Sequence, residues 1–265
     1  MADLVSELRG DVLIVTFNRP EKRNALSSEM LQALDDSLDQ AAENEALRAV
    51  ILTGAGEKSF SAGIDLEMLF EHLSSQPSGE RIRRLQGRLQ ELICRLEELE
   101  KPTIAAIEGS CVGGGLEVAL GCDLRVSSTE AKFGFPEAKI GMLPDLGGTS
   151  RLPRLGGPTM AKEWIFTGRL YPAQRALDLG IVNELTSPGQ ALETALALAR
   201  ELTSSAPLAI AWAKRVIDGG LSMALRDSLA LERDAMTEIL PSDDLKEGVA
   251  AFLEKRSARF KGNRG

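Results

Sequence analysis

Short apolar runs and longer amphipathic stretches alternate along the first half of the chain. Continuous apolar runs bounded by turn residues predict buried strands. These runs cover residues 12–17, 49–53 and 103–107, and residues 123–126 are predicted as a fourth strand. Apolar positions spaced three and four residues apart predict helices between them. The helices run from Ser27 or Ser28 to about Asn44, from Asp65 to about Leu73, and from Ser78 to Glu100, with a loop over residues 60–63. This alternation up to about residue 155 predicts a layered α/β core.

Beyond Gly156 the pattern becomes almost entirely helical, and Ile181-Val182 is the one β-rich interruption. The predicted helical segments cover residues 159–166, 172–179, 190–203, 208–217, 221–240 and 244–259. No flexible linker separates the two parts. We therefore expect an α/β core over residues 1–190 and a helical subdomain over residues 191–265.

Composition and charge restrict the class of protein. The chain has 265 residues, of which 43% are hydrophobic and 26% charged, as in ordinary soluble globular proteins. Its formal net charge of −8 disfavours a nucleic-acid partner. No signal-peptide pattern opens the chain, and no apolar run approaches the ~18 residues that cross a membrane. Three cysteines without a C-x-x-C pair fit a reducing compartment, so we expect a cytoplasmic protein.

His72 is the only histidine, and it lies in a polar stretch. A Ser-His-Asp device and a histidine-rich zinc site are therefore disfavoured, and no metal site is expected. Any acid/base chemistry must then come from carboxylates.

The run from Cys111 to Glu117 contains three consecutive glycines that lead into an apolar helix. Glycine lets a ligand approach the main chain closely, and the first N–H groups of a helix have no partner within it. Those N–H groups favour negative charge. The run therefore predicts an anion-stabilising backbone with Glu117 beside it as a proton-handling group.

Eight short motifs occur in an order that identifies a family resemblance. They are NRP at 18–20, NAL at 24–26, FSAGID at 60–65, KPTIAAIEG at 101–109, GGGLE at 113–117, FGFPE at 133–137, GGTSRL at 147–152 and AFLEKR at 251–256. Along nearly its whole length the chain resembles the enoyl-CoA hydratase/isomerase (crotonase) superfamily. The resemblance implies an α/β fold, a crotonase-like spiral of β-β-α turns with a C-terminal helical trimerisation region.

The same resemblance implies an oxyanion hole for an acyl-CoA thioester, made by the backbone N–H groups of Ile64 and Gly114. It places the two catalytic glutamates of hydratases at Glu117 and Glu137. A helix N-terminus favours the charged form of Glu117, whereas burial favours the neutral form of Glu137. We therefore expect Glu137 to donate the proton to C2 of the substrate.

Asp145 adds a third carboxylate. Dienoyl-CoA isomerases of the family carry a catalytic aspartate at this position, together with the glutamate matched by Glu137. A purely local role is the alternative, because Asp after Pro often caps a turn, here the turn into Gly147-Gly148.

The resemblance also implies a set of residues that bind substrate and coenzyme A. They are Lys22, Arg23, Ala25, Leu26, Ser61, Ala62, Gly63, Asp65, Gly113, Phe252 and Lys255. Lys22 and Arg23 are expected near the phosphates, and the loop over residues 61–65 near the adenine. Phe252 and Lys255 belong to a segment that often reaches the coenzyme A of a neighbouring subunit. Asp65 has the alternative role of capping the helix that follows it.

The sequence thus predicts an enoyl-CoA hydratase that adds water reversibly, in the syn sense, to a trans-2-enoyl-CoA. Its expected partner is the acyl-CoA substrate, and no cofactor is needed beyond the coenzyme A of that substrate. A homotrimer or dimer of trimers is expected, and no nucleic acid or membrane partner is expected. The main alternative is a double-bond isomerase that uses Glu137 and Asp145. A third alternative, an RNA-binding member of the fold, is disfavoured by the net charge of −8.

Overall fold

A six-stranded sheet forms the larger layer of the computed structural model, which describes residues 2–262. Its strand order is β1-β2-β3-β5-β7-β10. The strands are β1 (Leu4–Arg9), β2 (Val12–Phe17), β3 (Ala49–Gly54), β5 (Thr103–Ile107), β7 (Leu124–Ser128) and β10 (Glu184–Thr186). β1 runs antiparallel to β2, and every other pair is parallel. β2, β3 and β5 are nearly continuous runs of buried apolar residues, as expected for strands covered on both faces.

A smaller sheet of four short strands lies beside the first, in the order β4-β6-β8-β9. Its strands are β4 (Ser59–Ser61), β6 (Ser110–Val112), β8 (Lys132–Gly134) and β9 (Tyr171–Pro172). Three times in succession the chain adds one strand to the large sheet, one to the small sheet, and then forms a helix. This repeat is the β-β-α spiral, and it confirms the expected fold class.

Helices pack on both faces of the large sheet. The chain forms α1 (Ser28–Glu43), α2 (Leu66–Ser74), α3 (Gly79–Glu98), α4 (Gly114–Gly121), α5 (Gly148–Thr167), α6 (Ala173–Asp178) and α7 (Ala191–Thr203). α1, α3, α4 and α5 contribute to the main hydrophobic core on one face of the sheet. α7 packs on the other face through Ala191, Ala195 and Ala199. Short 3-10 helices, η1 (Pro20–Lys22) and η2 (Pro136–Ile140), complete this part.

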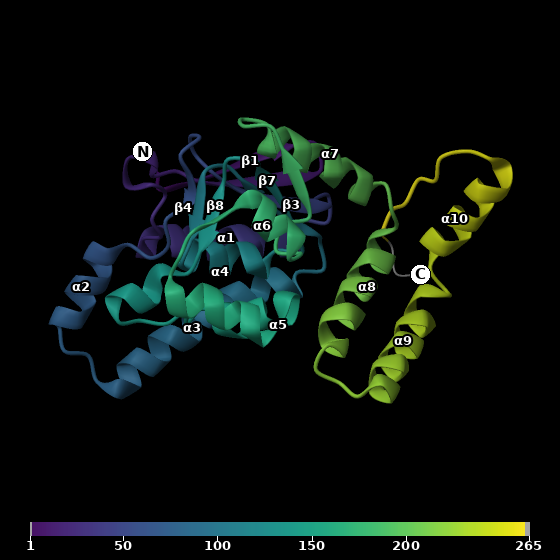
Figure 1. The fold of residues 1–265 in the computed structure, drawn as a ribbon. Helices are drawn as coiled ribbons and strands as arrows, with labels where there is room; N and C mark the ends of the chain where they lie inside the picture. Colours follow the sequence, from purple (N-terminus) through teal and green to yellow (C-terminus); the bar gives the residue numbers. More distant parts are fainter. Residues whose placement is uncertain (1, 263–265) are drawn as a thin grey trace.

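The last three helices lie to one side of this core, as Figure 1 shows. They are α8 (Pro207–Gly220), α9 (Leu225–Ile239) and α10 (Asp243–Glu254). Lys214 of α8 attaches them to the core, because its Nζ lies 3.0 Å from both Asp123 Oδ2 and the carbonyl oxygen of Leu96. α7 belongs to the sheet by its packing, and the division into domains at residue 190 stays a prediction.

The predicted helices and the four predicted strands are present. The structure also contains short strands whose sequences show no continuous apolar run. Ser27 caps α1 by accepting a hydrogen bond from Met30 N. Phe60 and Ser61 form part of β4 rather than a loop, because β4 pairs with β6 through Ser59 and Ser61. Ile181 and Val182 are buried outside any strand, and the strand that follows them begins at Glu184. Within residues 2–262, no helix combines the length and apolar character needed to cross a membrane.

Candidate active site

Two unpaired backbone N–H groups lie close together where β4 and β6 end. Gly114 is the first residue of α4, and Ile64 follows β4 by three residues. A Cβ placed on Gly114 would lie 3.5 Å from Ile64 N, and one placed on Gly63 would lie 3.0 Å from Gly114 N. Within residues 2–262, neither the Ile64 N–H nor the Gly114 N–H has a hydrogen-bond acceptor. The structure therefore brings together the two groups that the sequence predicted as oxyanion donors.

Local backbone geometry explains why these N–H groups stay free. Leu26 N donates to Gly63 O at 2.8 Å, and Asp65 N donates to Leu26 O at 3.1 Å. Leu26 thereby holds the chain on both sides of Ile64 and leaves the N–H of Ile64 unused. Gly63 and Gly113 have φ values of +90° and +55°, which glycine adopts without steric cost.

Glu117, in the first turn of α4, is held by the loop that precedes α5. Its side chain is buried, with the residue 1% exposed. Oε1 accepts hydrogen bonds from Leu146 N at 2.8 Å and from Gly148 N at 2.7 Å. Burial raises the pKa of Glu117 to about 8, and the charges of Glu137 and Asp145 add to the rise, while the two N–H donors oppose it.

Glu137 reaches the same region from η2. A Cβ placed on Gly113 would lie 2.9 Å from Glu137 Oε1, which locates this carboxyl group beside the glycine run. Its Oε2 is buried and has no hydrogen-bond partner in the described part of the chain. Burial also raises the pKa of Glu137, to about 7, and the charge of Asp145 contributes.

Asp145 is half-buried in the loop before α5, and burial raises its pKa as well. Helix α5 has Gly147 as its N-cap, and within residues 2–262 the N–H groups at its start make no hydrogen bond to the Asp145 side chain. Glu117 fills that role instead, by accepting from the N–H of Gly148. The negative charge of Asp145 raises the pKa of both glutamates, which links all three carboxyl groups electrostatically.

The pKa values depart from the sequence expectation that the helix N-terminus favours a charged Glu117. Both glutamates have raised pKa values, and that of Glu117 is the higher one. Its nearly complete burial outweighs the helix terminus and the two N–H donors. Burial therefore favours the protonated form of both carboxyl groups.

The residues predicted to bind coenzyme A fall into buried and exposed groups. Ser61 is fully buried, and its Oγ donates to Asn24 O at 2.8 Å, so its side chain serves the loop internally. Leu26 is also fully buried, Gly63 and Gly113 are the positive-φ glycines described above, and Ala25 and Ala62 are half-buried. Their predicted contacts with coenzyme A stay predictions.

Asp65 caps α2, as its alternative role predicted. Its Oδ1 accepts from Glu67 N at 3.0 Å, and its Oδ2 lies 2.9 Å from Arg19 Nη1. Burial opposes ionisation, but the Arg19 bond and the backbone N–H groups outweigh it and lower the pKa of Asp65. Lys22 Nζ lies 2.5 Å from Glu67 Oε2, and Arg23 is exposed. No role was predicted for Arg19, although its place in the NRP motif was a usable signal.

Within the single chain, Phe252 and Lys255 lie far from the other residues predicted to bind coenzyme A. In Figure 1, α10, which carries Phe252, lies at one side of the molecule, α2 lies at the other side, and α4 lies within the core. Phe252 is 83% exposed. One chain by itself therefore does not bring this segment to the glutamates.

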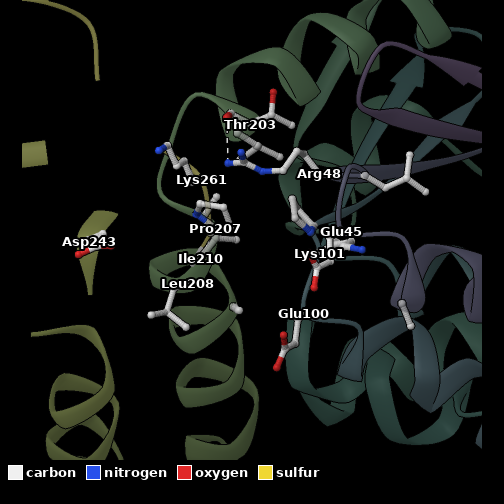
Figure 2. A pocket seen from close by; sticks show the side chains of 16 residues that line it. Glu45, Arg48, Glu100, Lys101, Thr203, Pro207, Leu208, Ile210, Asp243 and Lys261 are labelled. Carbon is white, nitrogen blue, oxygen red and sulfur yellow. Dashed lines mark hydrogen bonds between the residues drawn. The ribbon is translucent and has the colours of Figure 1, made fainter. Parts of the chain in front are cut away.

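A cavity of about 690 Å³ lies elsewhere, between the core and the C-terminal helices. Figure 2 shows its lining side chains, none of which is a predicted site residue. Arg48 donates to the carbonyl oxygens of Thr203 and Ser205, and Lys101 donates to those of Ala41 and Asn44. These cations complete the C-terminal ends of α7 and α1, so their role is structural.

A second, apolar cavity of about 310 Å³ is lined by α8, α9 and α10 and includes Phe252. Within residues 2–262, no group of three or more His, Cys, Asp or Glu side chains is arranged to hold a metal ion. Because the Glu137 carboxyl group lies beside the glycine run that contains Gly114, the cluster around Glu117 and Glu137 is the candidate active site.

Comparison with known proteins identifies the family of the chain. A sequence model of the family "Enoyl-CoA hydratase/isomerase" matches residues 7–263. The chain is 39% identical over 259 residues to the short-chain-enoyl-CoA hydratase of Clostridium acetobutylicum, covering 96% of this chain and 95% of that protein. It is 36% identical over 259 residues to the crotonyl-CoA hydratase of Syntrophomonas wolfei, covering 97% of each.

A crystal structure of an enoyl-CoA hydratase from Bacillus anthracis superimposes with a TM-score of 0.92 at 35% identity, covering 98% of this chain and 100% of that one. Sequence and fold thus agree along the whole chain. The protein belongs to the enoyl-CoA hydratase/isomerase family.

Proposed function

We propose that this protein is an enoyl-CoA hydratase that adds water reversibly to a trans-2-enoyl-CoA. One observation carries the proposal: the free N–H groups of Ile64 and Gly114 lie next to Gly113, and Glu137 Oε1 lies against that same glycine. A polarised thioester oxygen at the two N–H groups would have its C2 and C3 beside the carboxyl groups. The names of the relatives support the same activity.

The two N–H groups supply electrostatic stabilisation. Addition of water places negative charge on the thioester oxygen as C2 takes on enolate character. Fixed N–H donors stabilise such charge without reorganising, by roughly 3–4 kcal/mol per donor in comparable oxyanion holes. Gly114 N also lies at the N-terminus of α4, whose dipole favours negative charge.

The two glutamates divide the proton transfers. One carboxylate accepts a proton from water while the water oxygen bonds to C3, and one carboxylic acid gives a proton to C2. Hydrogen bonding favours ionised Glu117, because its Oε1 accepts from two N–H groups, and protonated Glu137, because its buried Oε2 has no partner in residues 2–262. The deeper burial of Glu117 acts in the opposite direction. We assign Glu137 as the proton donor to C2 and Glu117 as the base. After the reaction Glu117 has gained a proton from water and Glu137 has lost one to C2, so the total number of protons on the two carboxyl groups is unchanged.

Acyl-CoA is the proposed partner, with Lys22, Arg23 and the 61–65 loop near its nucleotide end. A homotrimer or a dimer of trimers is proposed as the assembly, and strongly exposed Phe252 and Leu253 on α10 support it. In such an assembly Phe252 and Lys255 would reach the site of a neighbouring subunit. A cytoplasmic location remains a prediction.

A double-bond isomerase is the second candidate, and the position of Asp145 favours it. This carboxyl group is half-buried and is coupled electrostatically to both glutamates. A third acid near the two glutamates could move a proton along a longer conjugated acyl chain.

One assay separates the two activities. Purified protein is given 2-enoyl-, 3-enoyl- and 3,5-dienoyl-CoA thioesters, and the change in absorbance is followed with each. A hydratase should turn over the 2-enoyl thioester fastest. Faster conversion of either of the other two substrates would replace this proposal with the isomerase.

A further inference from the structure

The loop that holds Glu117 is itself held by one arginine. Leu146 and Gly148, whose N–H groups bind Glu117 Oε1, flank Gly147, which has a φ of +119°. Both donors can converge on one oxygen only while the chain keeps this turn. The position of the Glu117 carboxyl group therefore depends on what fixes residues 146–148.

Arg151, in the first turn of α5, fixes them from behind. Its Nη1 donates to Leu146 O at 3.0 Å, and its backbone N donates to Gly147 O at 2.7 Å. A Cβ on Gly147 would collide with Nη1, so the guanidinium lies directly against this glycine. The other edge of the guanidinium forms a two-bond pair with Glu97 of α3, with Nε to Oε1 at 2.6 Å and Nη2 to Oε2 at 2.7 Å. Such a forked pair fixes direction as well as distance.

Within residues 2–262, Arg151 makes no hydrogen bond or ion pair with Glu117, and its positive charge is balanced by Glu97. The influences on the pKa of Glu117 are burial, the N–H groups of Gly148 and Leu146, and the charges of Glu137 and Asp145. Arg151 thus acts on Glu117 through the loop rather than through its field.

We infer that Arg151, oriented by Glu97, is a positioning residue that keeps the Leu146 and Gly148 N–H groups aimed at the Glu117 carboxylate during catalysis. This inference rests on the proposed function, in which Glu117 is the base. A lysine in its place would keep the charge and lose the fork, because one ammonium group cannot span Glu97 and Leu146 O in the same plane.

The test compares Arg151→Gln, Arg151→Lys and Glu97→Gln with the wild type, using crotonyl-CoA across a range of pH. Misplacing a catalytic group by about 1 Å costs on the order of 100-fold in rate, so both Arg151 variants should lose about 10- to 100-fold in kcat with little change in KM. Loss of the N–H donors removes stabilisation from the carboxylate, so the acidic limb of the kcat/KM profile should move to higher pH. Glu97→Gln should move it in the same direction by less.

Arg154→Gln is the matched control, because Arg154 lies three residues further along α5, is exposed and, among the residues 2–262, bonds only Ser150 O. It should leave kcat and the acidic limb unchanged. Folded Arg151 variants with wild-type kcat and an unmoved limb would overturn the inference. If neither Arg151 variant folds, the acidic limb of the kcat/KM profile of Glu97→Gln is the test. An unmoved limb in that variant would refute the inference. Full activity in Glu117→Gln would instead refute the proposed function.

Discussion

Gly115 of α4 lies against Ser61 of β4 so closely that a Cβ on the glycine would lie 2.6 Å from the Cβ of the serine. No L side chain fits this contact. The approach draws the start of α4 onto the end of β4, and with it Gly114 N toward Ile64 N. A packing requirement thus sets the spacing of the two proposed oxyanion donors.

Replacing Gly115 with alanine should therefore separate the two donors. We expect Gly115→Ala to lower the free energy of unfolding by about 1–3 kcal/mol, a typical cost of overpacking, and to lower kcat as well. Chemical denaturation and steady-state kinetics measure the two effects. Gly87→Ala is the control: Gly87 lies in α3, and a Cβ there meets nothing within 4 Å. It should instead stabilise the protein by about 0.5–1 kcal/mol. A Gly115→Ala protein as stable and active as the wild type would contradict this account.

Glu137→Gln should nearly abolish hydration of crotonyl-CoA while acyl-CoA binding persists. The amide keeps the shape of the side chain but cannot donate the proton to C2, and general acid catalysis typically contributes about 10²–10⁴-fold. Turnover in a stopped-flow spectrophotometer and binding of a saturated acyl-CoA by calorimetry check the two statements. Lys139→Gln, on the exposed side of η2, serves as the control. Retained activity in Glu137→Gln would remove the proposed proton donor.

Asp145→Asn should shift the pH dependence of hydration. Its negative charge raises the pKa of Glu117 and of Glu137, so its removal should lower both. The acidic limb of kcat/KM should then move to lower pH by less than about one unit. The profile is measured with crotonyl-CoA, and a shift to higher pH would be the wrong sign. If the protein is an isomerase, the same variant should also lose activity on 3,5-dienoyl-CoA, whereas Glu117→Gln should not.

Burial of Glu117 should make the protein less stable as pH rises. Its pKa is raised from 4.5 to about 8 in the folded chain, so the folded state binds the proton more tightly than the unfolded state. Its contribution is fully present below pH 4.5 and is lost as pH rises through about 8. Between pH 5 and pH 8, Glu117→Gln should gain about 1–4 kcal/mol relative to the wild type. Denaturant titrations at both pH values measure this. Glu91→Gln, which replaces an exposed residue of α3, should show the same pH dependence of unfolding free energy as the wild type. The prediction would be refuted if the pH dependence of Glu117→Gln were also the same as that of the wild type.

The strands and helices that the sequence predicted are those with strong apolar patterns. β2, β3 and β5 are buried almost throughout, and α1 has both a buried stripe and a serine cap. β1 gave no such signal, because Leu4 is its only buried residue and the strand lies at the sheet edge. The three-residue strands β4, β6 and β8 depend on pairing between distant segments, which a local pattern does not contain.

The candidate site divides in the same way. Ile64, Gly114, Glu117 and Glu137 could be named from motifs, and the structure brings them together. The order of the two glutamate pKa values could not be predicted, since it depends on how deeply each side chain is buried. Arg151 stood within a recognised motif, yet its role becomes visible only when Glu97 of a distant helix is placed beside it.

The loops that carry Ile64 N and Gly114 N follow β4 and β6, which are adjacent strands of the small sheet. In the sequence, α2 and the first half of α3 lie between these two strands. Chain inserted at that point can change in length or composition while the paired strands hold their register. Residues 66–86 can therefore be exchanged as a cassette, leaving intact the contact of Gly115 with Ser61 and the pair of Glu97 with Arg151.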